Sequence, residues 1–247
     1  TWDMLRKFAE TELRPHARQA ESDGRPSDEL LEKIKSLDLI SLIIPEAYGG
    51  MGLEQDSVSN ALALEALAYG DLSLAMSVSI PLLAAQIISE HGSEEQKAEL
   101  LPELVNGSIF HVGLGINNAL LATDPYQSSV VADESGEEII LNGLKTGVAF
   151  ADDAKTFLIS ASNESGECNL YFVHKDQEGV ELEEKEFMGL KGAPLSQINL
   201  SDCKINASQK LGGHNYSINY EQLVDSSRIG MSALALGVCQ AVLDYVV

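Results

Sequence analysis

Apolar side chains recur at the spacing of an α-helix along the first part of the chain. One stripe runs through residues 5–13. A second covers residues 30–37, just after Ser27, a residue type that caps helix N-termini. Further apolar patterns cover residues 56–69 and 72–91. The pattern therefore predicts a helical bundle at the N-terminal end of the chain.

Turn and cap residues divide these helical patterns. Pro45 and the pair Gly49-Gly50 cannot lie inside a helix, so the chain must turn there, and glycine accepts the positive φ that such turns often need. Pro81 divides the last apolar pattern and predicts two helical pieces. Ser93-Glu94-Glu95-Gln96 has the spacing of a capping box, which predicts a further helix that ends before Asn106-Gly107.

The period of the pattern falls towards two after about residue 108, and turn residues become frequent. Ile139–Leu141 ends in Asn142-Gly143, a dipeptide that favours a hairpin turn. Further strands are expected at Thr156–Ser160, Asn169–His174, Val180–Glu183 and Gln197–Leu200. This region therefore predicts a β-rich sandwich or barrel.

The helical pattern returns from Tyr216, and Arg228–Val247 reads as a long apolar helix. Such a helix needs a partner face, and none remains in the sequence, so we expect a further helical portion to pack against it. The chain is thus expected to be an α+β multidomain protein. Its parts are a helical domain at 1–107, a β domain at 108–215 and, at 216–247, the first helix of a C-terminal helical domain.

Composition excludes several classes of function. The net charge of −22 repels phosphate backbones, so nucleic-acid binding is not expected. The three cysteines form no CxxC pair and have no ligand spacing with the five histidines, which indicates reduced structural thiols and no metal site. No signal peptide is visible at the N-terminus, and a cytoplasmic-type compartment is expected.

The segment Leu72–Ser89 is uncharged and close to the length of a membrane span. Serine, glutamine and proline side chains interrupt it, and its flanks are acidic rather than basic. We therefore expect it to be buried in the helical domain, with no membrane span.

Several collinear segments resemble the acyl-CoA dehydrogenase family. Ile44–Leu53 and Glu65–Gly70 resemble its N-terminal helical domain. Glu138–Lys145 resembles the family motif YxLNGxK, Met188–Gly192 resembles a following strand and turn, and Asp225–Gly230 resembles the start of the long helix. The resemblance implies a helical domain, a β-sandwich or barrel domain and a C-terminal helical bundle. It also implies oxidation of the Cα–Cβ bond of acyl-CoA thioesters, with hydride transfer to FAD.

The resemblance places the flavin against two motifs of the β domain. The family motif TEPxAGSD aligns with residues 117–124, and WITNG aligns with residues 147–151. Asn117, Thr123, Gly147 and Ala149 are therefore the implied cofactor-binding residues. Gly147 replaces the tryptophan that packs on the flavin, a contact worth about 0.5–1.5 kcal/mol beyond its buried area. Ala149 replaces a hydroxyl, and a lost buried hydrogen bond costs roughly 1–3 kcal/mol. We therefore expect weakened flavin binding.

Leu120 and Ala122 stand where the motif has small residues, and their larger side chains also favour weakened flavin binding. On the substrate side, the resemblance implies that Thr123, Asp225 and Arg228 bind acyl-CoA. Asp225 and Arg228 are three apart, share one helix face and can form a simple ion pair instead. The family's catalytic base is a glutamate of the C-terminal bundle, expected beyond Val247, so no catalytic residue is assigned.

The sequence leaves more than one functional interpretation open. The first is an acyl-CoA dehydrogenase that binds FAD and acyl-CoA and passes electrons to an electron-transfer flavoprotein. The alternative is a flavin-poor, non-catalytic paralogue, acting as a subunit of a mixed oligomer or as an acyl-CoA-binding scaffold. The resemblance implies a homo- or hetero-dimer or tetramer, in the cytoplasm or, in a eukaryote, the mitochondrial matrix.

Overall fold

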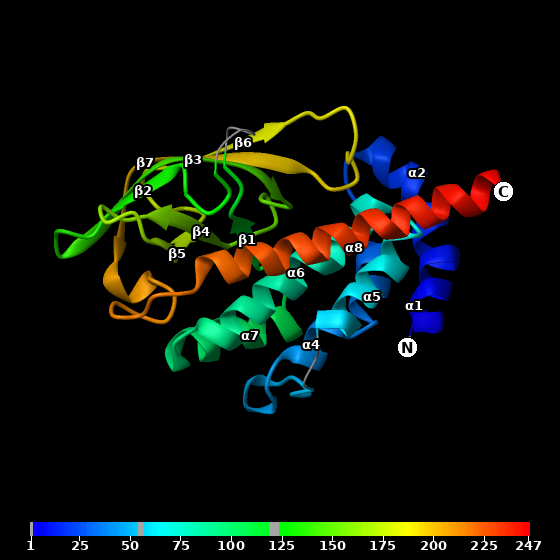
Figure 1. The fold of residues 1–247 in the computed structure, drawn as a ribbon, viewed down its shortest axis with the longest axis horizontal. Helices are drawn as coiled ribbons and strands as arrows, with labels where there is room; N and C mark the ends of the chain where they lie inside the picture. The colour runs from blue at the N-terminus through cyan, green and yellow to red at the C-terminus, as the bar shows by residue number, and fades with distance from the viewer. Residues whose placement is uncertain (1, 54–56, 119–123) are drawn as a thin grey trace.

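The computed structural model describes residues 2–53, 57–118 and 124–247. A helical half precedes a β-sheet, and one long helix runs from the sheet back across the helical half (Figure 1). The helices of the first half are α1 (Trp2–Phe8), α2 (Arg14–Asp23), α3 (Asp28–Lys35), α4 (Leu39–Ile43), α5 (Ser57–Ala68), α6 (Leu72–His91) and α7 (Glu94–Asn106).

The N-terminal apolar stripe forms a continuous helical rod, in which a π-helical turn at Ala9–Leu13 joins α1 to α2. Leu5, Ala9 and Leu13 are fully buried in the core of the helical half. The expected stripe is therefore confirmed.

The predicted caps are present. The Ser27 hydroxyl accepts a hydrogen bond from the Leu30 N–H at 3.3 Å and opens α3. At α7, Ser93 and Gln96 form both bonds of the capping box. These caps satisfy N–H groups that have no partner within the helix. The helix runs through Asn106, one residue further than predicted.

The turn at Pro45 forms as expected. A single 3₁₀ turn, Glu46–Tyr48, ends at Gly49, whose φ of 89° lies in the left-handed region. Gly50 has no room for a side chain, because a Cβ there would overlap the carbonyl of Ile44. The close approach and the positive φ both require glycine.

The prediction that Pro81 splits the apolar segment is wrong, because α6 continues through it as one helix. Pro81 gives up one backbone hydrogen bond. Twelve residues of α6 are buried, and that packing offsets the loss. By length and composition, α6 and the last helix are both apolar enough to cross a membrane. However, 67% of the relevant window of α6 is buried inside the protein, as in the core helix of a soluble domain.

The described strands form one sheet, in the order β1-β4-β2-β3-β7-β6, with β5 also pairing with β4. Pairing is antiparallel except where β4 meets β1 and β2. A core of buried side chains, most of them aliphatic or aromatic, lies within the sheet half. The strands are β1 (Val112–Gly115), β2 (Val130–Asp133), β3 (Glu138–Ala149), β4 (Thr156–Ser162), β5 (Cys168–His174), β6 (Val180–Lys185) and β7 (Leu195–Asn206).

The hairpin turn expected at Asn142-Gly143 is not formed. Strand β3 continues through both residues, and its register against β7 shifts there in a β-bulge. Gly143 has a φ of 138°, and a Cβ would overlap the carbonyl of Ser129. Asn142-Gly143 therefore forms a β-bulge, at which the backbone of Gly143 approaches the backbone of Ser129 closely. The β2–β3 connection lies instead at residues 134–137.

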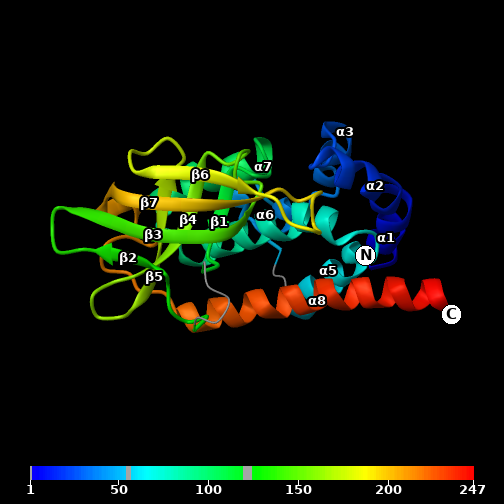
Figure 2. The ribbon, with the colours of Figure 1, turned by 90° about the horizontal axis from the view of Figure 1, so that it is seen from above.

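Helix α8 (Tyr220–Val246) begins eight residues before the predicted start at Arg228. The Asn219 side chain caps it by accepting from the Gln222 N–H at 3.1 Å. Figure 2 shows α8 along one side of the molecule, where it packs on α5. Only 17% of its most apolar window is buried, so its outer face lacks a partner among the described residues.

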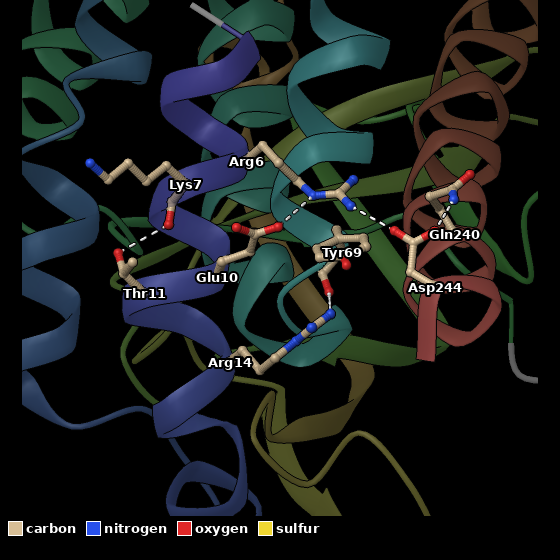
Figure 3. Close-up of polar contacts among 8 residues, drawn as sticks. All are labelled: Arg6, Lys7, Glu10, Thr11, Arg14, Tyr69, Gln240 and Asp244. Carbon is tan, nitrogen blue, oxygen red and sulfur yellow. Dashed lines mark hydrogen bonds and ion pairs between the residues drawn. The ribbon is translucent and has the colours of Figure 1, made fainter. Parts of the chain in front are cut away.

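Arg6, Arg14 and the ring of Tyr69 form a cluster that connects the C-terminal end of α8 to the N-terminal helices (Figure 3). Arg6 donates to Asp244 at 3.1 Å and to Glu10 at 3.2 Å, and its guanidinium lies over the ring of Tyr69. Arg14 donates to the Tyr69 carbonyl at 2.7 Å and stacks 4.4 Å from the ring centroid. Cation–π contacts thus join the buried Tyr69, just after α5, to α1 and α2, and the Arg6–Asp244 ion pair joins α1 to α8.

Candidate functional site: a cleft between the helical half, the sheet and α8

A cleft of about 190 Å³ opens where the helical half meets the sheet. Its walls come from α5, α6, β1, the start of the following turn, β3 and α8. Most of the lining is apolar, and examples are Leu64, Ile80, Leu83, Leu114, Ile229 and Leu234. A second apolar cavity of about 230 Å³ shares Asn60, Leu64 and Leu82 with it and extends towards α4. Such a concave, mostly apolar site with few polar groups is typical of a small-molecule site.

The structure brings Asn117 and Gly147 together at this cleft, although thirty positions separate them in sequence. The Thr146 N–H donates to the Asn117 carbonyl at 3.2 Å, which joins the turn after β1 to β3. Gly147 has a φ of 64°. A Cβ built there would meet only the side-chain amide of Asn117, at 3.5 Å, so open space lies above this glycine.

Ala149, the third described cofactor candidate, does not line the cleft. It is 3% exposed and packs in the helical core beside Phe150, which stacks on Phe110 with ring centroids 4.1 Å apart. The register of β3 against β7 shifts between Lys145 and Val148, so the simple alternation of a strand does not continue from Gly147 to Ala149. Thr123, with Leu120 and Ala122, lies outside the described residues.

Asp225 and Arg228 of α8 do not line the cleft themselves, although their neighbours Ser226, Ser227 and Ile229 do, and they form an ion pair at 3.6 Å. Tyr126 joins them: its hydroxyl donates to Asp225 at 2.9 Å and accepts from Arg228 at 3.1 Å. The Asp225 carboxylate raises the pKa of Tyr126, so the phenol stays protonated. The Arg228 and Asp225 side chains are 54% and 60% exposed.

Sequence reasoning missed Tyr126. The only local signal was its position two residues after Asp124, whose carboxylate accepts the Tyr126 N–H at 3.0 Å. That bond makes Asp124 a turn cap. The contact of Tyr126 with α8 spans about a hundred residues of sequence, and no local pattern shows it.

Lys145, on β3 two residues before Gly147, is fully buried and does not line the cleft. Its ammonium donates to Ser128, Ser160, Asn118 and the Ile116 carbonyl, at 2.7, 2.8, 3.0 and 3.3 Å. Burial lowers its pKa from 10.5 to about 7. Lys145 ends the segment Glu138–Lys145 that resembles a family motif, but no sequence pattern predicted that its side chain is buried.

No group of His, Cys, Asp or Glu side chains in the part of the chain that the structure describes could hold a metal ion. Cys168 and Cys203 are buried, and burial raises the pKa of each thiol to about 11.

Family comparison agrees with this architecture. Residues 1–108 match the model of the acyl-CoA dehydrogenase N-terminal domain, and residues 121–203 match that of the acyl-CoA dehydrogenase middle domain. The chain belongs to the acyl-CoA dehydrogenase family. The fold expected from the resemblance, a helical domain followed by a β domain and a C-terminal helix, is confirmed.

Individual relatives cover nearly all of this chain. It is 29% identical over 251 residues to the probable acyl-CoA dehydrogenase YngJ of Bacillus subtilis, covering 98% of this chain and 65% of that protein. A glutaryl-CoA dehydrogenase from Mycobacterium smegmatis in complex with FADH2 superposes with a TM-score of 0.83 at 23% identity, covering 98% of this chain and 62% of that one. Butyryl-CoA dehydrogenase from Megasphaera elsdenii superposes with a TM-score of 0.82 at 25% identity, covering 98% and 66%. The chain thus spans less than two thirds of the length of these relatives.

Within this acyl-CoA dehydrogenase fold, the cleft combines elements from all three parts of the chain. Helices α5 and α6 lie in the range that matches the N-terminal domain, β3 lies in the range that matches the middle domain, β1 lies between the two ranges, and α8 closes the third side.

Proposed function

We propose that this chain forms the cofactor- and substrate-binding part of an acyl-CoA dehydrogenase. The reaction is α,β-oxidation of an acyl-CoA thioester, with hydride transfer to FAD. One observation carries the proposal: the apolar cleft at the junction of α5, α6, β1, β3 and α8, with Asn117 and Gly147 on its sheet side. Family membership supports the reaction class.

The described residues fit a flat ring system on the sheet side of the cleft. Open space lies above Gly147, and the Asn117 amide lies beside it. Apolar side chains of α6 and α8 line the cleft as well. FAD supplies the hydride acceptor when it is bound, and the protein supplies binding, orientation and exclusion of water. Asn117 offers a donor and an acceptor to a ring edge, while Gly147 and the apolar walls accommodate the ring faces.

The acyl group is expected in the apolar part of the cleft. Ile80, Leu83 and Ile229 offer a surface that accepts hydrocarbon without unsatisfied polar groups. The adjoining cavity past Asn60 gives additional apolar room. At the rim, Arg228 offers a cation to the anionic phosphates of coenzyme A. Among the cleft-lining residues that the structure describes there is no carboxylate, so we propose that another part of the assembled enzyme supplies the base.

A second candidate function is a flavin-poor subunit or acyl-CoA-binding scaffold. The open space at Gly147 favours it, because a glycine at position 147 offers no aromatic ring to stack on a flavin. Such a subunit would keep the apolar cleft and the Tyr126–Asp225–Arg228 cluster but lack redox chemistry. It would pair with an active relative in a mixed oligomer.

The proposal also covers the electron acceptor, the assembly and the compartment of the protein. An electron-transfer flavoprotein is the proposed electron acceptor, and a homo- or hetero-oligomer the proposed assembly. The cytoplasm, or the mitochondrial matrix in a eukaryote, is the proposed compartment, and nucleic acid is not a partner of so acidic a protein.

A visible absorption titration of the purified full-length protein with FAD tests the proposal. Saturable binding that shifts the flavin band, and that an acyl-CoA then perturbs, supports the dehydrogenase. Acyl-CoA binding without flavin binding supports the scaffold. Failure to bind either ligand contradicts both candidates.

A further inference from the structure

Lys145 occupies an unusual environment for a lysine. Its side chain is 0% exposed, and it takes part in no ion pair with the residues that the structure describes. Buried lysines are normally paired with a carboxylate, because an isolated buried charge is costly. Here four neutral oxygens surround the ammonium, which has three protons to donate. Because burying the unpaired ammonium of Lys145 is costly, its enclosure by four oxygens indicates a specific role for this side chain.

Two of the four oxygens belong to the residues on either side of Asn117. Lys145 donates to the Ile116 carbonyl and to the Asn118 side chain. The Ser160 hydroxyl, itself bonded to Lys145, also donates to the Ile116 carbonyl, at 3.3 Å. The ammonium of Lys145 therefore bonds to the residues on both sides of Asn117 and holds the turn that carries Asn117 into the cleft.

The other contacts of this turn lead back to the same cluster. Asn118 accepts from the Ser129 N–H at 2.9 Å and donates to the Gln127 carbonyl at 2.7 Å. Ser128, between them, is the nearest partner of Lys145. The cluster thus joins the turn after β1 to β3, to β4 and to the segment before β2.

We propose that Lys145 is a positioning residue for flavin binding: its ammonium holds Ile116 and Asn118 in place, so that Asn117 faces the cofactor in the cleft. The proposal rests on the proposed function. Lys145 does not line the cleft and acts only through the turn.

The charge state of Lys145 gives this arrangement a pH dependence. Burial lowers the pKa of Lys145 to about 7. The titratable groups around the cluster are Cys168 on β5 and Tyr220 on α8, and burial raises the pKa of both, so both stay neutral near pH 7. Lys145 is therefore the group of the described cluster that changes charge in the neutral range. As a neutral amine it donates two hydrogen bonds instead of three, and the turn is held less firmly.

The first test is FAD affinity as a function of pH, measured by flavin titration of the full-length protein and of Lys145→Met. Wild-type affinity is expected to fall as the pH rises from about 6 to about 8. The variant is expected to bind at least about tenfold more weakly, with that pH dependence removed. The control is Lys155→Met, an exposed lysine of the same domain, which keeps the wild-type affinity and profile.

A second readout needs no flavin. Amide hydrogen exchange at residues 116–118 and at Thr146, whose N–H bonds to Asn117, is expected to be faster in Lys145→Met while β6 and β7 keep wild-type protection. If the wild type binds no FAD, the proposed function fails, and exchange alone decides the role of Lys145.

The inference is overturned if the amide hydrogens of the turn exchange as slowly in Lys145→Met as in the wild type. It is also overturned if the wild type binds FAD and Lys145→Met binds FAD with the same affinity. Should the variant fail to fold, Ser160→Ala replaces it, since it removes one acceptor of Lys145 and one bond to Ile116. It is expected to accelerate exchange at the turn to a smaller extent. No change there also overturns the inference.

Discussion

Gly237 of α8 lies directly against the backbone carbonyl of Glu65 in α5, so closely that a Cβ at position 237 would overlap that oxygen. Only glycine permits this approach of two helix backbones. The contact sets how near α8 lies to α5, and so the position of Leu234 and Gly230 on the cleft wall.

Gly237→Ala is therefore expected to lower the free energy of unfolding by about 1–3 kcal/mol, as overpacked sites do. Gly230→Ala on the same helix is the matched control. A Cβ there meets only Leu64, at an ordinary 3.5 Å. Alanine is also the better helix former by about 1 kcal/mol, so the control should be neutral or stabilised. Urea denaturation of both variants measures the difference, and equal stabilities would contradict the close contact.

Substitutions at Gly147 and Ala149 should affect flavin binding differently. Gly147→Trp places a ring in the open space of the cleft and is expected to strengthen FAD binding several-fold, despite the strain of about 1–2 kcal/mol at its positive φ. Ala149→Thr buries a hydroxyl in an apolar core and is expected to cost about 1–3 kcal/mol of stability with no gain in affinity. FAD titration and thermal unfolding check both. A gain in affinity from Ala149→Thr would mean that position 149 faces the flavin.

Tyr126→Phe removes the hydroxyl that joins Asp225 to Arg228. Because Asp225 and Arg228 are exposed and Tyr126 is half-buried, the effect on stability should be small, within about 0.5 kcal/mol. Acyl-CoA binding is expected to weaken a few-fold while FAD affinity stays unchanged. Calorimetric titration with each ligand separates the two. Equal losses for both would place Tyr126 in a general structural role.

The depressed pKa of Lys145 also predicts how stability depends on pH. Its pKa is about 7 in the folded protein and 10.5 in its ordinary state, so the unfolded chain binds more protons between these values. The penalty for burying the ammonium is therefore full below about pH 7 and fades as the pH approaches about 10. Relative to Lys145→Met, the wild type should gain stability across that window. Urea denaturation at a series of pH values measures this, and a difference that is constant with pH would contradict the shift.

Local sequence signals predicted much of the helical half. Ser27 and the Ser93–Gln96 box opened the expected helices because capping depends on neighbouring residues alone. The same local rules failed at Pro81 and at Asn142-Gly143. Burial keeps α6 helical through the proline, and sheet pairing turns the dipeptide into a bulge. In both places tertiary packing outweighed local preference.

The candidate site was predictable only in part. The resemblance led to Asn117 and Gly147, which the structure places together at the cleft. It did not show that Ala149 points into the core, because that depends on a register shift. Tyr126 and the enclosure of Lys145 were also missed. Their partners are far away in sequence, and no spacing rule connects them.

The most direct test of the central claim is to add acyl-CoA thioesters of different chain lengths, without oxygen, to the full-length protein loaded with FAD. At least one of them is expected to bleach the visible band of the oxidised flavin, because a dehydrogenase passes hydride from the substrate to the cofactor. A flavin that stays oxidised with every acyl-CoA that binds would contradict dehydrogenase activity and favour the non-catalytic subunit.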